Sequence, residues 1–524
     1  MKKTFLLVLS VCYFGSNSYG QTPTWAENIA PILYKNCATC HNSNGVAPFA
    51  LLTYDEAYRN RSGIKAAVVS KNMPPWPPDP NYRHLANERI LSNADINAIT
   101  AWANGNAPQG NPANAPTPPT FGAGSAISAP NLVLTIPTYN INTTNDLYRC
   151  FVLPSSLLAD RFITEVEVIP GNRKVVHHVL AYQDTSSIPA QLDAADPGIG
   201  YTNYGGTGSN SSQLVVGWVP GQGPVKFPKG MGIRLTARAN LILQVHYPGG
   251  VVNQKDSTKI IIKFAPVGSA NRELFNRPIL AHVAPYLING PLAIPANQTK
   301  SFTERLLIPR DGSFLSIAPH MHLIGRRTKV YGLMPNGDTL RLINIPDWDF
   351  NWQGAYGFRN VLKFPVGMTL VAESFYDNTP NNPYNPSSPP KLVTLGESTT
   401  DEMMLTYFTF MAYQSGDENI VLDSSAIISN TFDIQQKERL KLACYPNPTR
   451  SNMTLNFTLP QREICNIDIF ALNGVAVKGI LRGEWFDKGE HQLPISTADL
   501  PSGTYIVRLS SEKTYGIEQF VRVE

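Results

Sequence analysis

The sequence is poor in cysteine, in histidine and in net charge. Of six cysteines, Cys444 and Cys465 lie in one C-terminal module where they could bridge, and Cys150 has no obvious partner, so a buried thiol is expected there. Lysine and arginine number 43 against 39 acidic residues, and the net charge of +4 gives no reason to expect nucleic acid or anionic lipid as a partner. Beyond the first residues no apolar run is long enough for a transmembrane segment.

The N-terminus predicts export. Lys2 and Lys3 precede an apolar run over residues 5–14, and small residues before Gln21 form a plausible cleavage site. This pattern is typical of a signal peptide, here residues 1–20. Cys12 leaves with it, and the mature chain is expected outside the cytoplasm.

Composition predicts a mainly β protein of several domains. The 43 prolines and 38 glycines, with many β-branched and aromatic residues, favour short strands and turns. Residues 107–125 are rich in Pro, Ala and Asn and read as a linker. Alternating strands follow, which predicts two tandem sandwiches at 126–280 and 281–432 and a last module at 433–524. The expected strands include 132–136, 162–168, 241–247, 259–264 and 361–372.

Cys37, Cys40 and His41 form a C-x-x-C-H motif, the sequence for covalent haem attachment. The two thiols form thioethers with the haem vinyl groups, and the histidine is the proximal iron ligand. The alternative, a structural zinc site, needs a second ligand pair nearby, and the next cysteine is Cys150. The motif therefore predicts one haem c.

The sixth iron ligand is expected to be Met73, because a thioether followed by Pro74 and Pro75 can be held at a fixed distance from the iron. His84 is the alternative. Helices are expected at residues 25–34 and from a capped start at Ser92. The segment 21–106 resembles the small, all-α haem c domains of secreted bacterial oxidoreductases.

Five of the nine histidines cluster in the middle of the chain, in three strand-like strings. Imidazoles grouped in this way suit copper, zinc or iron. A cupin iron site needs a glutamate soon after the His-x-His pair, and none follows. Adjacent histidines on a strand face opposite ways, so a doublet reaches one metal only at a strand end or bulge. The alternative is that they are structural histidines. The five are His177, His178, His246, His320 and His322.

These strings, with Asp401-Glu402-Met403, resemble the copper type II ascorbate-dependent monooxygenases, such as dopamine β-monooxygenase and peptidylglycine α-hydroxylating monooxygenase. The resemblance covers about residues 148–411 and implies two jelly-roll sandwiches with one copper ion each. Met404 stands beside the implied methionine ligand as a competitor. The implied ligands are His177, His178 and His246 for the first copper, and His320, His322 and Met403 for the second.

The resemblance also implies the chemistry. The all-histidine copper stores an electron, and the methionine-bound copper is the hydroxylating centre that binds O2. The family takes electrons from ascorbate. The attached haem suggests a relay from an external one-electron donor, ascorbate-like or a redox protein.

Substrate contacts are only partly kept. Peptide-hydroxylating relatives hold a substrate carboxylate with an arginine, an asparagine and a tyrosine, where this chain has Ala318, Leu405 and Tyr407. A C-terminal glycine peptide is therefore not expected. The expected substrate is a small or peptide-like organic molecule, with Tyr407 at the site. An aromatic run could stack on a ring or belong to the core: Trp348, Trp352, Tyr356 and Phe358.

The last module resembles the C-terminal sorting domain of type IX secretion, a small β-sandwich. The matching strings lie at residues 445–448, 472–474 and 500–508. A generic immunoglobulin-like adhesion domain is the alternative. The resemblance implies passage through the type IX machinery and an extracellular or outer-surface location in a Gram-negative bacterium.

Two functions follow. One is a secreted copper monooxygenase that hydroxylates a C–H bond with O2. The other is a surface haem and copper protein that transfers electrons or binds metal without hydroxylation.

Overall fold

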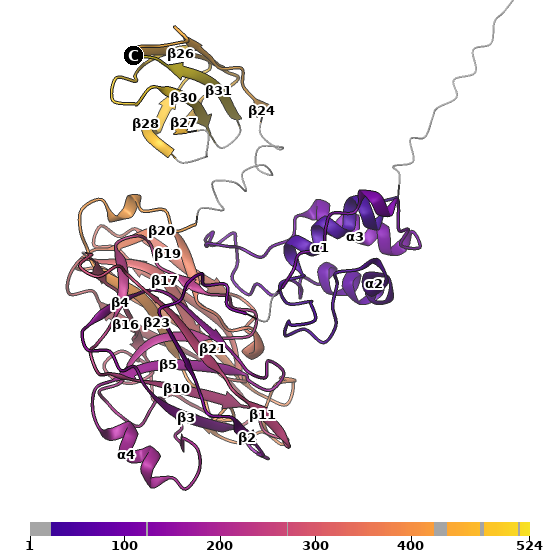
Figure 1. Cartoon of the computed structure of the whole chain (residues 1–524), viewed down its shortest axis with the longest axis vertical. Coiled ribbons are helices and arrows are strands. Elements are labelled where there is room, and N and C mark those ends of the chain that lie inside the picture. The colour runs from indigo at the N-terminus through magenta and orange to yellow at the C-terminus, as the bar shows by residue number, and fades with distance from the viewer. Residues whose placement is uncertain (1–21, 122–123, 270, 424–437, 472–475, 512–513) are drawn as a thin grey trace, which may run out of the picture. The chain divides into compact units, whose positions relative to one another are not determined.

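The computed structural model describes residues 22–121, 124–269, 271–423, 438–471, 476–511 and 514–524. The predicted signal peptide and the hairpin turn expected at residues 472–474 lie outside them. The chain divides into two compact units, residues 1–419 and 420–524 (Figure 1). The predicted mainly β architecture with a small helical N-terminal segment is confirmed. In the described part of the chain, no helix is both long and apolar enough to cross a membrane.

The N-terminal helical segment, residues 22–106, has its own core. Its helices are η1 (Trp25–Ile29), α1 (Ala30–Asn36), α2 (Tyr54–Val69) and α3 (Asn93–Asn104). Ser92 caps α3 by accepting a hydrogen bond from the backbone N–H of Asp95, as the sequence predicts. Thr53 and Glu56 form a capping box at the start of α2, a helix that the periodicity analysis missed. The core includes Trp25, Leu33, Ile64, Ile99 and Trp102.

The first sandwich consists of two sheets that are antiparallel except for the parallel pair of β9 and β13. One runs β1 (Leu132–Thr135), β12 (Lys259–Phe264), β4 (Arg161–Ile169), β9 (Met231–Leu235) and β13 (Arg272–Glu273), with β8 (Val225–Lys226) on β4. The other runs β6 (Tyr201–Thr202), β3 (Leu147–Pro154), β10 (Asn240–Tyr247), β5 (His178–Asp184) and β7 (Gln213–Trp218). A ribbon of β2 (Tyr139–Ile141) with β11 (Gln254–Asp256) and the helix α4 (Ile188–Ala195) complete it.

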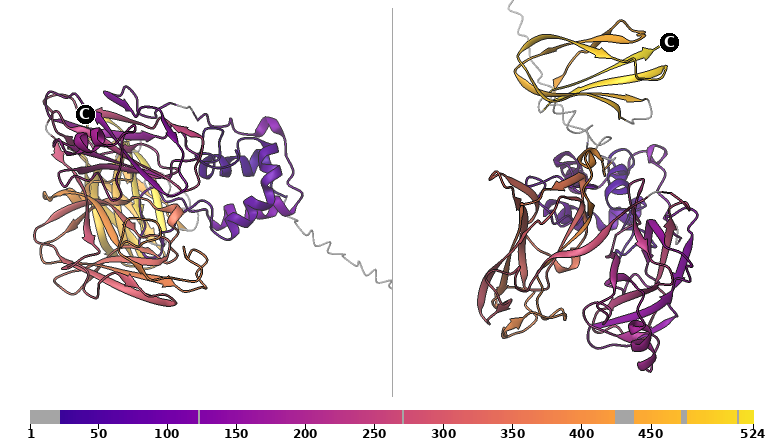
Figure 2. Two further views of the ribbon diagram at one scale, coloured as in Figure 1. Left: turned by 90° about the horizontal axis from the view of Figure 1, so that it is seen from below. Right: turned by 90° about the vertical axis from the view of Figure 1, so that its left-hand side faces the viewer.

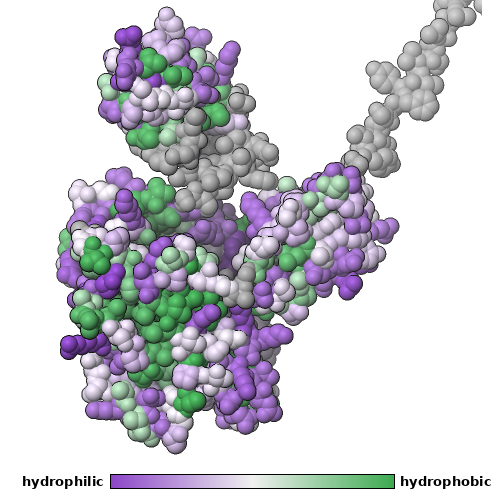
Figure 3. Space-filling view, in the orientation of Figure 1, coloured by the Kyte–Doolittle hydropathy of each residue, from purple (hydrophilic) through white to green (hydrophobic). Residues whose placement is uncertain are grey.

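The second sandwich repeats this plan. One sheet runs β14 (Phe275–Ala281), β23 (Leu405–Ala412), β17 (Gly312–His320) and β20 (Tyr356–Phe364). The other runs β16 (Gln298–Leu307), β21 (Thr369–Asn378), β18 (Gly325–Leu333) and β19 (Thr339–Ile345), and β15 (Ala293–Ile294) pairs with β22 (Val393–Thr394). Hydrophobic surface gathers across the middle of the sandwich face shown in Figure 3.

One predicted strand is wrong. Residues 361–372 form the end of β20 and the start of β21, which lie in different sheets. Pro365 and Gly367, with a φ of 83°, turn the chain between them. The apolar pattern of residues 361–372 continues through this turn, which is why the sequence predicted one strand where the structure has parts of two.

Backbone hydrogen bonds join the helical segment to the second sandwich, and Figure 2 shows the helices and the sheets in two further views. Asp79 N–H donates to the carbonyl of Asn344 at 2.8 Å, and Ala86 N–H donates to the carbonyl of Gly357 at 2.8 Å. Leu85 forms an isolated β-bridge with Phe358. Backbone hydrogen bonds therefore hold this segment on the second sandwich, in addition to the covalent link.

The C-terminal unit is a small sandwich. A five-stranded sheet runs β24 (Glu438–Arg439), β31 (Thr514–Arg522), β30 (Gly503–Ser510), β27 (Glu463–Ala471) and β28 (Ala476–Phe486). The facing sheet runs β25 (Ala443–Tyr445), β26 (Asn452–Leu459) and β29 (Gly489–Ser496). Cys444 and Cys465 are both free thiols in this structure, so the bridge considered from their positions is not formed.

Candidate metal and haem sites

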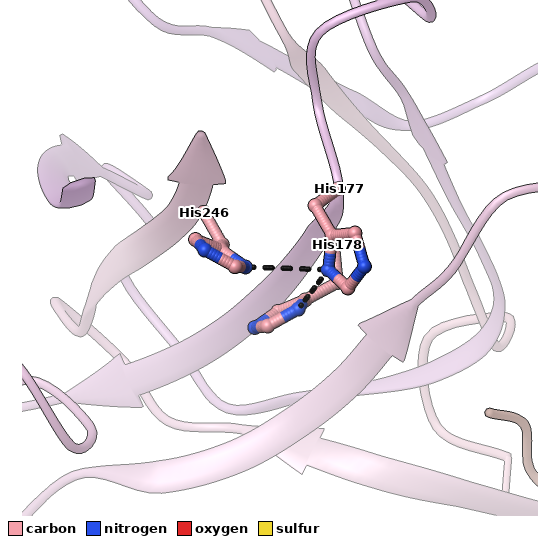
Figure 4. Close-up of side chains that lie close together, drawn as sticks. All are labelled: His177, His178 and His246. Carbon is pink, nitrogen blue, oxygen red and sulfur yellow. Dashed lines mark hydrogen bonds between the residues drawn. The ribbon is translucent and has the colours of Figure 1, made fainter. Parts of the chain in front are cut away.

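Three histidines converge in the first sandwich (Figure 4). His178 is the first residue of β5 and stands opposite His246 of β10 in the antiparallel register. His177 lies just before the strand, where its N–H donates to the carbonyl of His246 at 2.9 Å. Because the strand begins at the second histidine, both members of the doublet reach one point, as the strand-end condition requires.

The nitrogen atoms of this first set suit a metal. His177 Nδ1 lies 3.2 Å from Nδ1 of both His178 and His246, and the ligand atoms of all three lie within 4.8 Å of one another. Burial lowers the pKa of His177 to about 4 and that of His178 well below its ordinary value. The rings of His177 and His178 are therefore neutral at neutral pH and offer lone pairs to a cation.

Two residues that the sequence did not indicate support His246. Tyr148 stacks on its ring at 4.2 Å between centroids and an angle of 4°. Asp146 Oδ1 lies 3.6 Å from His246 Nε2, and this contact, with a hydrogen bond from the hydroxyl of Thr399, lowers the pKa of Asp146. A carboxylate facing the outer nitrogen of a histidine fixes the orientation of a metal ligand.

The second pair lies at the end of β17. Alternate residues of one strand point to the same face, so a continuous strand would place both histidines on one side. His320 is however the last residue of β17, and His322 lies beyond it. Their ring centroids are 5.0 Å apart at 82°. His320 Nδ1 lies 2.5 Å from Gln353 Oε1, and His322 Nδ1 lies 3.2 Å from the carbonyl of Asp401. Each Nδ1–H donates to an oxygen, which leaves both Nε2 atoms for a metal.

Glu402 holds the backbone of Met403, the predicted methionine ligand, on the loop that carries His322. Its buried carboxylate accepts backbone hydrogen bonds of 2.9 to 3.1 Å from four N–H groups: His322, Ile324, Gly325 and Met403. Burial raises the pKa of Glu402 to about 8, against the lowering effect of these donors. The structure thus brings the backbone of Met403 to the loop that carries His322.

A sixth histidine lies near this pair. His282, one residue after β14, accepts a hydrogen bond from the N–H of Met404 at 3.3 Å. Burial, with the nearby His320, lowers the pKa of His282 to about 4. Met403 and Met404 are therefore held by different partners. A lone histidine at a strand end carries no sequence signal, which is why it was missed.

Phe350 connects the two histidine sets. It opens the short helix η3 (Phe350–Trp352) and stacks on His177 at 5.3 Å and 18°. The same ring meets His322 edge-on at 5.8 Å and 87°. The two sets therefore face each other across one aromatic side chain. In the predicted aromatic run, Trp348, Tyr356 and Phe358 are core residues.

Tyr407 lies on β23 opposite Ala318 of β17, and Leu405 stands opposite His320. Burial raises the pKa of Tyr407 to about 12, so its hydroxyl is protonated at neutral pH. Ala318 and Leu405 offer no charge to a carboxylate at these positions. A substrate role for Tyr407 stays a prediction.

The C-x-x-C-H motif forms a tight turn after α1. Cys40 and His41 N–H both donate to the carbonyl of Cys37, at 3.1 and 2.9 Å, and both cysteines are free thiols. His41 Nδ1 lies 3.1 Å from the carbonyl of Phe49, which leaves Nε2 for an iron atom. Trp76 Nε1 is buried with no hydrogen-bond partner among the described residues, a donor that a haem carboxylate would satisfy. These residues fit a covalently attached haem.

The two proposed sixth ligands differ in their surroundings. Met73 is partly buried in the loop after α2, and its N–H donates to the carbonyl of Ala67 at 3.2 Å. The His84 side chain is 61% exposed and pairs with Glu88 at 3.1 Å. This pairing favours Met73.

Comparison with known families agrees with this geometry. Residues 132–251 match the model for the copper type II ascorbate-dependent monooxygenase N-terminal domain, and residues 443–523 match the secretion system C-terminal sorting domain. The chain thus carries a segment that matches the N-terminal domain of the copper type II ascorbate-dependent monooxygenases and a C-terminal segment that matches the sorting domain. The first match contains all three histidines of the first set, and the second indicates secretion.

No curated protein matches the chain. Among solved structures, PNGase F, a glycosylasparaginase from Flavobacterium meningosepticum, aligns over 54% of this chain and 97% of its own at 9% identity and a TM-score of 0.23. Bacteroides uniformis β-glucuronidase 3 aligns over 46% of this chain at 11% identity and a TM-score of 0.12, and the chain spans only 29% of that enzyme. Ruminococcus gnavus β-glucuronidase aligns over 47% of this chain and 39% of its own, at 10% identity and a TM-score of 0.13. Likenesses this low carry no functional inference.

Proposed function

We propose that the chain is a secreted copper-dependent monooxygenase that hydroxylates a C–H bond of an organic substrate with O2, and that it holds two copper ions and one covalently attached haem. The observation that carries the proposal is the convergence of His177, His178 and His246 inside the segment that matches the monooxygenase family. The sorting domain supports export by the type IX machinery to the outer surface of a Gram-negative cell.

The two histidine sets would each bind one copper ion, and the two ions would have different roles. Bound copper supplies one-electron redox chemistry and a place for dioxygen. The first set offers three imidazoles and an orienting carboxylate, Asp146, which would suit a copper that cycles without exchanging ligands. The second offers the Nε2 atoms of His320 and His322 and the soft thioether of Met403, which favours the reduced metal that binds O2.

The substrate is a small or peptide-like organic molecule that lacks the carboxylate anchor of peptidylglycine. Ala318 and Leu405 line the strand pair that carries His320, and neither can hold an anion. Tyr407 is protonated and can donate a hydrogen bond to a neutral group.

The haem gives the enzyme a route to an external one-electron donor, ascorbate-like or a redox protein. Cys37 and Cys40 would attach it covalently, and His41 and Met73 would ligate its iron. A one-electron carrier matches the demand of copper, which changes oxidation state by one electron at a time.

Metal analysis with electron paramagnetic resonance of the full, haem-loaded chain tests the proposal. We expect two Cu(II) per chain. The neighbouring methionines provide a matched pair of variants: Met403→Leu should lose O2-dependent hydroxylation across a panel of neutral organic substrates, and Met404→Leu should keep it. One copper per chain, or equal activity in both variants, would support the electron-transfer or metal-binding alternative instead.

A further inference from the structure

The N-terminal helical segment contacts the second sandwich through residues 76–89, here called the docking loop. Backbone hydrogen bonds from Asp79 and Ala86 anchor it to Asn344 and Gly357. Leu85 and Phe358, which form a β-bridge, are 1% and 0% exposed. An interface with buried side chains and paired backbone groups is a fixed contact and not a chance approach along a linker.

Two aromatic rings meet where the docking loop begins. Trp76, three residues after Met73, lies edge-on to Tyr356 of β20, with centroids 5.5 Å apart at 87°. Tyr356 is buried. The guanidinium of Arg89 lies 5.9 Å from the Trp76 ring, and the charge of Arg89 also lowers the pKa of Cys40, a haem-attachment cysteine, against the effect of burial. The ring pair is therefore next to the haem-attachment turn.

From Tyr356 the contacts continue to a predicted copper ligand. A Cβ at Gly354 would lie 3.6 Å from the Tyr356 ring, so the backbone at Gly354 packs close to it. The preceding residue, Gln353, places its side-chain oxygen 2.5 Å from His320 Nδ1. Tyr356 also stands opposite Ile317 of β17, the strand that ends at His320. Packed groups and one hydrogen bond thus join the docking loop to the second histidine pair.

We propose that Trp76 and Tyr356 couple the haem to the second copper site, so that electrons enter the copper centre at His320. This inference rests on the proposed function. With both groups bound, the step would transfer one electron: the haem iron would be oxidised from Fe(II) to Fe(III), the copper would be reduced from Cu(II) to Cu(I), and no bond would form or break. An external one-electron donor reduces the haem again.

A second contact leads toward the first set. A Cβ at Gly221, which has a φ of 83°, would lie 3.1 Å from Cys40 Sγ. From there the backbone leads to Trp218, which pairs with Val179 beside His178. This route runs through Pro220, which has no N–H, and ends on a strand neighbour of the ligand. The Trp76 route has two rings in contact and ends on the ring of the ligand itself, so the structure favours it.

The test is flash photoreduction of the haem in full-length, haem- and copper-loaded protein, without oxygen or substrate. Haem reoxidation is followed by its absorbance, and loss of Cu(II) by electron paramagnetic resonance. We expect Trp76→Leu and Tyr356→Leu to slow reoxidation at least about tenfold, because each removes a ring from the contact chain. Trp76→Phe and Tyr356→Phe should restore most of the rate, because each keeps an aromatic ring. The haem potential is measured in every variant, so that an effect of the lost Trp76 Nε1–H on the haem is separated from loss of the ring contact.

Tyr82→Leu is the matched control. Tyr82 belongs to the docking loop but contacts Lys329 and Arg341 on the other sheet of the sandwich, away from His320. It should leave the rate unchanged. If Tyr82→Leu slows haem reoxidation as much as Tyr356→Leu does, the rings of Trp76 and Tyr356 only hold the segment in place, and the proposal is wrong.

Single-site variants distinguish the two routes. His322→Ala, which disables the second site, should stop haem reoxidation, whereas His246→Ala should not. The reverse result would assign entry to the Gly221 contact and overturn the inference. A chain that takes up no haem or no copper would contradict the proposed function itself. If the chain binds haem and copper fully but replacing Trp76 or Tyr356 leaves the rate of haem reoxidation unchanged, only the inference is contradicted.

Discussion

The two histidine sets are built by different means. The first is fixed by the ladder between β5 and β10, where His178 and His246 stand in register, and an anion, Asp146, faces it from outside. The second lies where β17 ends, and its outer contacts are neutral oxygens of Gln353 and Asp401. A carboxylate partner raises the basicity of a histidine ligand and favours the more highly charged metal. Under the proposed function, these surroundings would favour Cu(II) at the first set and Cu(I) at the second.

The largest expected effect concerns the second set, which depends on one side chain. Glu402→Leu removes the acceptor of four buried N–H groups. We expect the free energy of unfolding to fall by about 3–5 kcal/mol, since unsatisfied buried donors cost about 1–3 kcal/mol each and the loop relaxes in part. Thermal unfolding measures this. Glu397→Leu, a nearby control without such bonds, should cost much less, and equal losses would show that Glu402 does not hold the loop.

Removing the negative charge beside the first histidine set should reduce the difference in copper affinity between the two sets. Asp146→Asn keeps the size of the side chain but removes its charge. We expect copper affinity at the first set to fall by about 10–100-fold, with the second set unchanged. Competition titration with a chelator, read by electron paramagnetic resonance, separates the sites. A uniform loss at both sites would mean that Asp146 acts through its link to Thr399 between the sandwiches and not through His246.

A second buried carboxylate of the same sandwich shows what Glu402 would be without its donors. Glu304 is 0% exposed, and neither of its carboxylate oxygens has a hydrogen-bond partner among the described residues. Burial raises the pKa of Glu304 to about 8. The folded chain therefore keeps the proton that the unfolded chain loses near the ordinary pKa. Between that value and about pH 8, the free energy of unfolding should fall by about 1.4 kcal/mol per pH unit as the pH rises.

Glu304→Gln should remove this dependence. Denaturant unfolding between pH 5 and pH 8 provides the measurement, and Glu373→Gln, an exposed residue on a neighbouring strand, serves as the control. An unchanged pH slope in Glu304→Gln would show that the carboxyl ionises freely in the folded state.

The smallest expected effect is at Phe350, which touches both sets. Stacking contacts contribute about 0.5–1.5 kcal/mol, so Phe350→Leu should weaken copper binding at each set by about tenfold or less. Both Cu(II) spectra should change together. A change confined to one set would show that the ring is only a neighbour of the other.

The local sequence determined the parts that depend on residues close together in the chain. The C-x-x-C-H turn, the capped start at Ser92, the alternation of the strands and the histidine strings all follow from spacing over a few residues. The doublet His177-His178 also indicated its own geometry, because a strand end was the stated condition for a shared metal.

Only the tertiary structure decided what surrounds these residues. Glu402 bonds His322, which is 80 positions away in the chain, and Asp146 contacts His246 on a neighbouring strand. The docking loop bonds β20 across 274 positions of the chain. Such contacts depend on strand register and on which sheet each strand joins, as the division of residues 361–372 shows. Sequence patterns report the face of a strand and its period, whereas the identity of its neighbours is set by the packing of the whole sandwich.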